Sequence, residues 1–248
     1  MARPGMAGMT TIEDLNALAP DAVRAALAGP PHQAAAFLRD AARAGVVEAQ
    51  FQLGRMLLDG HDMGPAPAEG LHWFAEAARR GHVSAMNMVG RCYEHGWGIA
   101  ADPERAAAWY RAAADRGLDW GMYNLATLLA LGNGANQDRD AALALFRRAA
   151  ALGHAKSINM IGSFLEDGWV VERDIGAAAD HYRRAAEAGD FRGQFNHARM
   201  LIDAGEADAA TRWLRRLPDS ATPAFLDKVR LWLKARPEAM LRRVAAEL

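Results

Sequence analysis

Residues 81–116 read GHVSAMNMVGRCYEHGWGIAADPERAAAWYRAAADR, and this stretch decides the fold because its pattern recurs along the chain. Glycines return at intervals of 36 residues, at Gly45, Gly81, Gly117, Gly153 and Gly189. Columns of small residues, aromatic residues and paired alanines keep the same register. Self-similarity at a fixed period of this length is the signature of a repeat protein. We therefore predict about five tandem copies of one structural unit.

Each period has the pattern of two helices. The first helix, residues 46–59 in the first repeat, follows a glycine that can end the preceding helix in the left-handed conformation, and Gly60 closes it. The second helix has a start signal in Asp102, a capping residue, followed by Pro103 at the first helical position. The matching starts in the other repeats are Pro67, Asp138 and Asp174.

The second helix places its large and small apolar residues on one face. The pairs Trp109-Tyr110 and Ala113-Ala114 lie three to five residues apart, so they share that face. Small faces let antiparallel helices approach closely, and the aromatic side chains fill the space between repeats. One helix pair cannot bury its apolar faces alone, so neighbouring pairs must stack into an all-α solenoid.

The chain at this point resembles the Sel-1-like repeat family. The resemblance rests on the string AQFQLG at residues 49–54, the closing Gly60, and WYRAAA at residues 109–114. It covers roughly residues 33–205 and implies a right-handed α/α superhelix of about five 36-residue helix pairs, related to the tetratricopeptide repeat. It also implies an adaptor or scaffold that acts in signalling and complex assembly. Secreted members with a cysteine pair in each repeat differ from this chain, which has only Cys92.

The two ends depart from the repeat pattern. We expect residues 1–32 to form a tail and a helical cap, with short helices after Thr10 and over residues 20–28. Residues 33–205 form the repeat solenoid. Residues 206–248 form a shortened last hairpin and a C-terminal helical cap, with helices that begin at Pro223 and Pro237. Residues 211–248 are basic, with nine Lys/Arg against four Asp/Glu.

Composition excludes several classes of function. The hydrophobic fraction is 51%, the charged fraction 24% and the net charge -1, which gives no global electrostatic argument for nucleic acid. No apolar run approaches the ~18 residues of a membrane-spanning helix, and we see no secretory signal after Met1. The single cysteine favours a reducing compartment. We expect a cytoplasmic protein without membrane insertion, and the Ala/Arg-rich composition hints at a bacterial source.

The first helix of each repeat leaves one stripe of side chains unburied, in the columns of residues 48, 51, 55 and 58. The relationship to the tetratricopeptide repeat implies that this stripe lines a concave groove. Asparagine amides can hold a peptide group, Arg or Lys can bind carboxylates, and Trp or Tyr supply stiff contact area. The candidate groove residues are Arg55, Asn87, Arg91, Trp120, Tyr123, Thr127, Lys156, Asn159, Ser163, Arg192 and Arg199.

Structural interpretations compete with binding at several positions. Asn87 and Asn159 can equally satisfy neighbouring polar groups, and the aromatic column of Tyr123 can pack between repeats. Trp97 and Trp169 share a loop column, where packing on the adjacent helix is favoured over an exposed anchor. The basic C-terminal cap is more often a solvated face than a docking site.

No catalytic or metal-binding motif stands out. Walker-type, Gly-x-Ser-x-Gly and His-Glu-x-x-His patterns are absent, so no cofactor, catalytic residue or metal site is predicted. The leading hypothesis is a non-catalytic, monomeric interaction module that binds a peptide or protein segment in the groove. One alternative is an enzyme or small-molecule binder that uses Glu94, Lys156 and Glu166. Another is a regulatory subunit that folds stably only within a complex.

Overall fold

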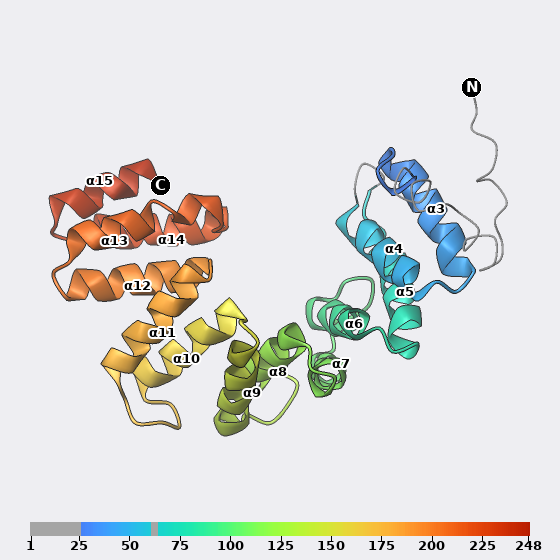
Figure 1. Ribbon diagram of the computed structural model, residues 1–248, viewed down its shortest axis with the longest axis horizontal. Coiled ribbons are helices and arrows are strands. Elements are labelled where there is room, and N and C mark those ends of the chain that lie inside the picture. Colours follow the sequence, from blue (N-terminus) through green and yellow to red (C-terminus); the bar gives the residue numbers. More distant parts are fainter. Residues whose placement is uncertain (1–25, 61–63) are drawn as a thin grey trace. The chain divides into compact units, whose positions relative to one another are not determined.

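The computed structural model describes residues 26–60 and 64–248. These residues form thirteen α-helices and no strand (Figure 1). The helices are α3 (Pro31–Arg43), α4 (Val47–Asp59), α5 (Pro67–Arg79), α6 (Val83–His95), α7 (Pro103–Asp115), α8 (Asp119–Leu131), α9 (Arg139–Ala151), α10 (Ala155–Asp167), α11 (Ile175–Glu187), α12 (Phe191–Asp203), α13 (Ala207–Leu214), α14 (Pro223–Lys234) and α15 (Ala239–Glu247). None of these helices is long and apolar enough to cross a bilayer.

The chain falls into two compact units, residues 1–137 and 138–248. In the described part of the first unit, each helix from α3 to α8 packs against the next, and in the second unit the helices from α9 to α13 do the same. The ten helices from α3 to α12 are all 13 residues long. This regularity confirms the all-α solenoid of helix pairs.

The helix boundaries follow the capping residues. The side chains of Asp102, Asp138 and Asp174 each accept a hydrogen bond from the backbone N–H three residues later, as the sequence predicts. At the other ends, the glycines after α4, α6, α8 and α10 have φ between 69° and 83°. An L-residue adopts this left-handed conformation only at a cost, which explains why glycine recurs there.

Large aromatic rings of the second helices fill the interior of each unit. Phe74 and Tyr110 in the first unit, and Phe146 and Tyr182 in the second, are at most 1% exposed. Three of these rings, those of Phe74, Tyr110 and Tyr182, lie directly against a glycine of a first helix, at Gly54, Gly90 and Gly162. A Cβ added at Gly90 would stand 2.7 Å from the Tyr110 ring. The small residues thus let the two helices of a repeat approach closely, as expected, and the Tyr110 ring fills the space against Gly90 within its own repeat.

The C-terminal helices close the second unit with their own apolar cluster. Leu214, Leu217, Leu233 and Leu241 are fully buried there, with Phe195 packed alongside. Helix α14 starts at Pro223 as predicted, whereas the last helix starts at Ala239 and not at Pro237. The N-terminal helices predicted after Thr10 and over residues 20–28 fall almost wholly on residues 1–25, outside the described residues.

Candidate binding surface on the first helices

Two adjoining hollows lie on the first helices of the first unit. The larger hollow has a volume of about 480 Å³ and is lined by Arg55, Leu58, Asp59, Pro65, Pro67, Met88, Arg91 and Trp97. The smaller hollow, of about 220 Å³, is lined by Phe51, Ser84, Asn87, Met88, Arg91, Leu118 and Trp120. Met88 and Arg91 border both. The predicted groove residues Arg55, Asn87, Arg91 and Trp120 thus line these two hollows.

Arg91 lies at the junction of the hollows, where it contacts a ring face and a sulfur atom. Its guanidinium carbon stands 4.9 Å from the centre of the Trp97 ring, and one of its nitrogens is 3.8 Å from the Met88 sulfur. Among the described residues, no carboxylate forms an ion pair with it. The Trp97 ring is half-buried and also contacts His95, with the ring centres 4.7 Å apart. The Trp97 ring therefore packs against the Arg91 guanidinium and is not an isolated, fully exposed side chain.

Two asparagines of the predicted stripe are used between neighbouring repeats. Asn124 donates its side-chain amide to the Asn87 side-chain oxygen at 2.8 Å, and Asn196 donates to Asn159 at 2.9 Å. Asn87 is 8% exposed and Asn159 is 4% exposed. Sequence reasoning missed Asn124 and Asn196, although their recurrence 72 residues apart matches that of their partners.

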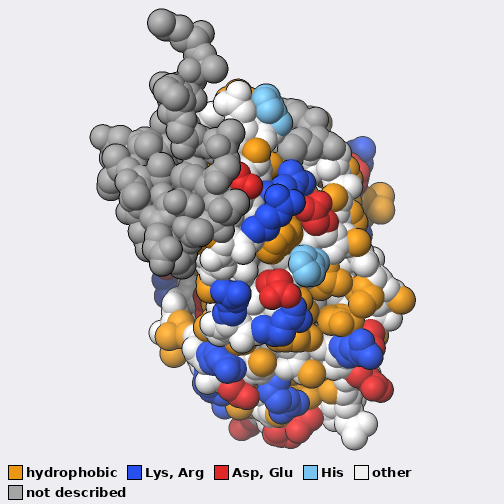
Figure 2. Space-filling view, turned by 90° about the vertical axis from the view of Figure 1, so that its right-hand side faces the viewer, with side chains coloured by type: hydrophobic (Ala, Val, Ile, Leu, Met, Phe, Trp, Pro, Cys, Tyr) orange, Lys and Arg blue, Asp and Glu red, His pale blue; other side chains and the backbone are white. Residues whose placement is uncertain are grey.

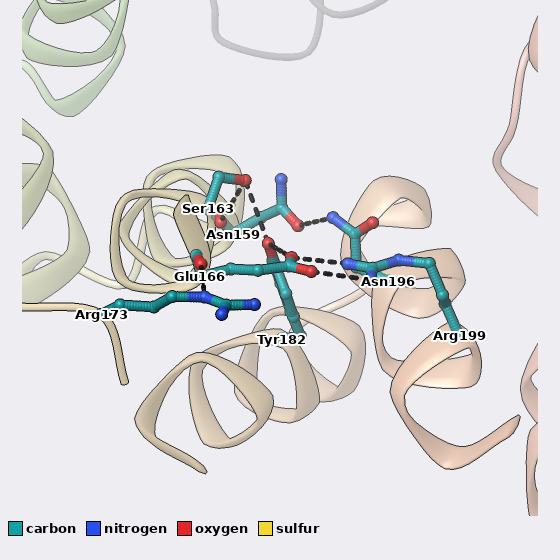
Figure 3. A network of polar contacts seen from close by, with 7 residues as sticks. All are labelled: Asn159, Ser163, Glu166, Arg173, Tyr182, Asn196 and Arg199. Atoms are coloured by element: carbon teal, nitrogen blue, oxygen red, sulfur yellow. Dashed lines mark hydrogen bonds and ion pairs between the residues drawn. The ribbon is translucent and has the colours of Figure 1, made fainter. Parts of the chain in front are cut away.

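A polar network in the second unit centres on the Glu166 carboxylate (Figure 3). Arg199 donates to its two oxygens at 2.7 and 2.6 Å, and the Tyr182 hydroxyl donates to it at 2.8 Å. The Arg199 hydrogen bonds, helped by Tyr182, hold the pKa of Glu166 below its usual range despite partial burial. Burial in turn raises the pKa of Tyr182. The Arg199 guanidinium on α12 is thus bound to Glu166 on α10 and links these two helices.

The remaining candidate residues are placed as follows. Trp120 is 43% exposed, and its ring meets Tyr123 edge-on with the ring centres 6.1 Å apart. The Thr127 hydroxyl donates to the Tyr123 carbonyl at 2.9 Å, and the Ser163 hydroxyl accepts a hydrogen bond from Tyr182 at 3.2 Å. Of the stripe's remaining cations, Lys156 is half-buried, and the exposed Arg192 lies over the Phe191 ring at 4.7 Å.

Other side chains singled out by the sequence are packed. Arg139 lies over the Trp169 ring at 4.7 Å, and Phe164 meets that ring edge-on with the centres 5.4 Å apart. Cys92 is fully buried, and burial raises the pKa of its thiol to about 11. Tyr110 donates a hydrogen bond to the Glu94 carboxylate. The described residues contain no group of three or more His, Cys, Asp or Glu that could hold a metal ion.

Charge on the surface is mixed in sign. Figure 2 shows the face at the N-terminal helices, where basic and acidic side chains alternate and hydrophobic ones lie between them. A duplex-binding protein needs several cations gathered on one face, because phosphate contacts dominate its affinity. On the face in view, acidic side chains lie between the basic ones.

Comparison with known proteins places the chain in a family. The Sel1 repeat model matches residues 47–82, 83–118, 121–154 and 155–190, more than half of the chain. No curated protein sequence matches it. A solved Sel1 repeat protein from Oxalobacter formigenes is similar, with a TM-score of 0.75 and 22% identity over 89% of this chain and 94% of that one.

Two further solved structures share the fold. One is a protective antigen of uropathogenic Escherichia coli with an SLR fold, at TM-score 0.66 and 23% identity, over 87% of this chain and 49% of the antigen. The other is an immunity protein from Pseudomonas aeruginosa, at TM-score 0.58 and 15% identity, over 82% of this chain and 80% of that one. Sel1 repeats generally serve as protein–protein interaction modules and are typically non-catalytic scaffolds. From its four matched repeats, this chain belongs to the Sel1 repeat family.

Proposed function

We propose that this protein is a non-catalytic, cytoplasmic interaction module that binds a peptide or protein segment in the two hollows on α4, α6 and α8. The observation that carries the proposal is the shared border of the hollows, where Arg91 and Met88 belong to both. A segment that crosses this border can bury a side chain on each side of one fixed cation. Interface anchors are commonly of this kind, with aromatic and arginine side chains at the centre.

The surface is preorganised for binding. The hollows are lined by helical residues and by loop residues adjacent to helices, so few side chains must be ordered when a partner arrives. Phe51 and the Trp120 ring offer apolar contact area in the smaller hollow, with Trp120 accessible to a partner. Proline and leucine side chains do the same in the larger hollow. The binding residues that we propose are Arg55, Arg91 and Trp120, whereas Asn87 lines the smaller hollow but is engaged by Asn124.

The contacts of the second unit favour a different use of its stripe. Three residues of this stripe form hydrogen bonds within the chain: Asn159, Ser163 and Arg199. The partner of Arg199 is Glu166. Such satisfied groups gain little from a partner, because binding would exchange one hydrogen bond for another. We therefore assign partner binding to the first unit.

Site-specific photocrosslinking in the native cells tests the proposal. A photoreactive amino acid replaces Trp120, on the smaller hollow, and in a control variant it replaces Arg111, which is exposed on the second helix α7. We expect a discrete crosslinked protein from position 120 and none from position 111. Crosslinks from position 111 alone, or the same crosslinks from both, would contradict the proposed surface. A thermal shift by metabolites together with no crosslink would favour a small-molecule binder instead.

A further inference from the structure

The repeat register gives Arg91 a counterpart, Arg199, which pairs with an acidic residue, whereas no described residue pairs with Arg91 in this way. Arg91 and Arg199 occupy the same column, three repeats apart. The residue that faces Arg199 is Glu166, and the same shift of three repeats brings Glu166 onto Leu58. Leu58 and Arg91 line the same hollow, so the two positions also lie on a common surface in the first unit. A leucine thus stands where the second unit has the carboxylate.

In the part of the chain that the structure describes, no carboxylate accepts hydrogen bonds from the Arg91 guanidinium. Arg199 is bound by two carboxylate oxygens at 2.7 and 2.6 Å, whereas Arg91 contacts a methionine sulfur and the face of an indole ring. Neither a thioether nor a ring face replaces a carboxylate for a planar fork of N–H donors. Arg91 is also half-buried, which weakens solvent screening of its charge.

The residues around Arg91 indicate which side chains a partner would place beside the group that binds Arg91. On one side are the leucine, prolines and tryptophan of the larger hollow, and on the other are Phe51, Leu118 and Trp120 of the smaller one. A second cation, Arg55, borders the larger hollow. The Asp59 carboxylate also borders the larger hollow. Its negative charge offsets one of the two arginines, so the lining has a net positive formal charge.

From this geometry we infer that the partner segment carries an acidic side chain, Asp or Glu, which binds Arg91 and takes the place that Glu166 holds at Arg199. An apolar side chain flanks the acidic residue on each side and enters one hollow. This inference rests on the proposed function and specifies the chemistry of its partner. It also assigns a role to Leu58. An acidic residue at this position would pair with Arg91 within the chain, as Glu166 pairs with Arg199, and would leave Arg91 unable to bind the partner.

Selection of random short peptides on the full-length chain tests the inference. The peptides are displayed without a free C-terminus, and the enriched sequences are then synthesised with amidated ends. We expect them to share an acidic residue with apolar neighbours. Arg91→Gln and Leu58→Glu should each weaken their binding by about ten- to a hundredfold, the range for a hydrogen bond to a charged group. Arg199→Gln, in the matching column, is the control and should bind as the wild type does.

The outcomes separate the two proposals. Enriched peptides without an acidic preference, or an acidic preference that survives Arg91→Gln, would overturn the inference and leave the interaction module standing. Binding that depends on a free C-terminal carboxylate would overturn the choice of an acidic side chain. Failure to enrich any peptide would count against the proposed function and the inference together. Circular dichroism of each variant is compared with that of the wild type, so that a loss of binding can be distinguished from a loss of folding.

Discussion

The close contact between Gly90 and the Tyr110 ring predicts a large effect from one added methyl group. In Gly90→Ala, the new Cβ would stand 2.7 Å from two ring carbons and 3.3 Å from the Ala106 carbonyl oxygen. Carbon atoms prefer separations of about 3.5–4.0 Å, so the ring or the helix must move. Tyr110 is fully buried and its hydroxyl is bonded to Glu94, which leaves the ring little room.

The magnitude follows from two opposing terms. Overpacking a filled core costs about 1–3 kcal/mol, and replacing a mid-helix glycine by alanine returns about 1 kcal/mol of helix propensity. We expect Gly90→Ala to lower the free energy of unfolding by up to about 2 kcal/mol. Urea unfolding followed by far-UV circular dichroism measures the change in midpoint.

A matched glycine supplies the control. Gly176 is also helical, but a Cβ there would meet only a side-chain oxygen of Asp174 at 3.5 Å, an ordinary contact. Gly176→Ala should be neutral or more stable by up to about 1 kcal/mol. If Gly90→Ala were as stable as Gly176→Ala, the ring would not be packed on the glycine column, and the reason given for that column would fail.

Three further predictions concern the loops, the polar network and the thiol. Val170 has φ of 53°, so Val170→Gly should relieve left-handed strain and raise the thermal midpoint by an amount worth about 0.5–1 kcal/mol; a lower midpoint would contradict this. Glu166→Gln should cost about 1–3 kcal/mol at pH 7. Folding lowers the pKa of Glu166, so the carboxylate stabilises the fold fully at a pH above its unfolded pKa, and this stabilisation is lost as the pH falls through the folded-state pKa. The difference in thermal midpoint between wild type and variant should therefore shrink from pH 7 to pH 3. A difference that stays constant over this range would contradict the prediction. Cys92, with its thiol pKa raised to about 11, should react with iodoacetamide at pH 8 only after denaturant is added, and rapid labelling of the native protein would refute its burial.

The sequence predicts the helix pairs well because their signals are local. The aspartate caps and the closing glycines act within one turn of the chain, so the column of Asp102 marks each helix start directly. The pairing of Gly90 with Tyr110 is likewise set inside one repeat. The last helix was misplaced at Pro237 because a proline is compatible with the turn before a helix as well as with its first residue.

The candidate site was harder to predict because its contacts cross from one repeat to the next. Whether Asn87 faces a partner or Asn124 depends on how far neighbouring helices rotate, and a single period does not encode this angle. The pairing of Arg199 with Glu166 could have been found by comparing columns 33 residues apart. The hollows themselves depend on where the loop residues Pro65 and Trp97 lie, which the helical pattern leaves open.

The most direct test of the account is a crystal structure of the full-length chain bound to a selected acidic peptide. The account predicts that the peptide lies across the two hollows of the first unit, with its Asp or Glu carboxylate within hydrogen-bonding distance of the Arg91 guanidinium. A peptide bound on the outer faces of the second helices, or on α14 and α15, would contradict it.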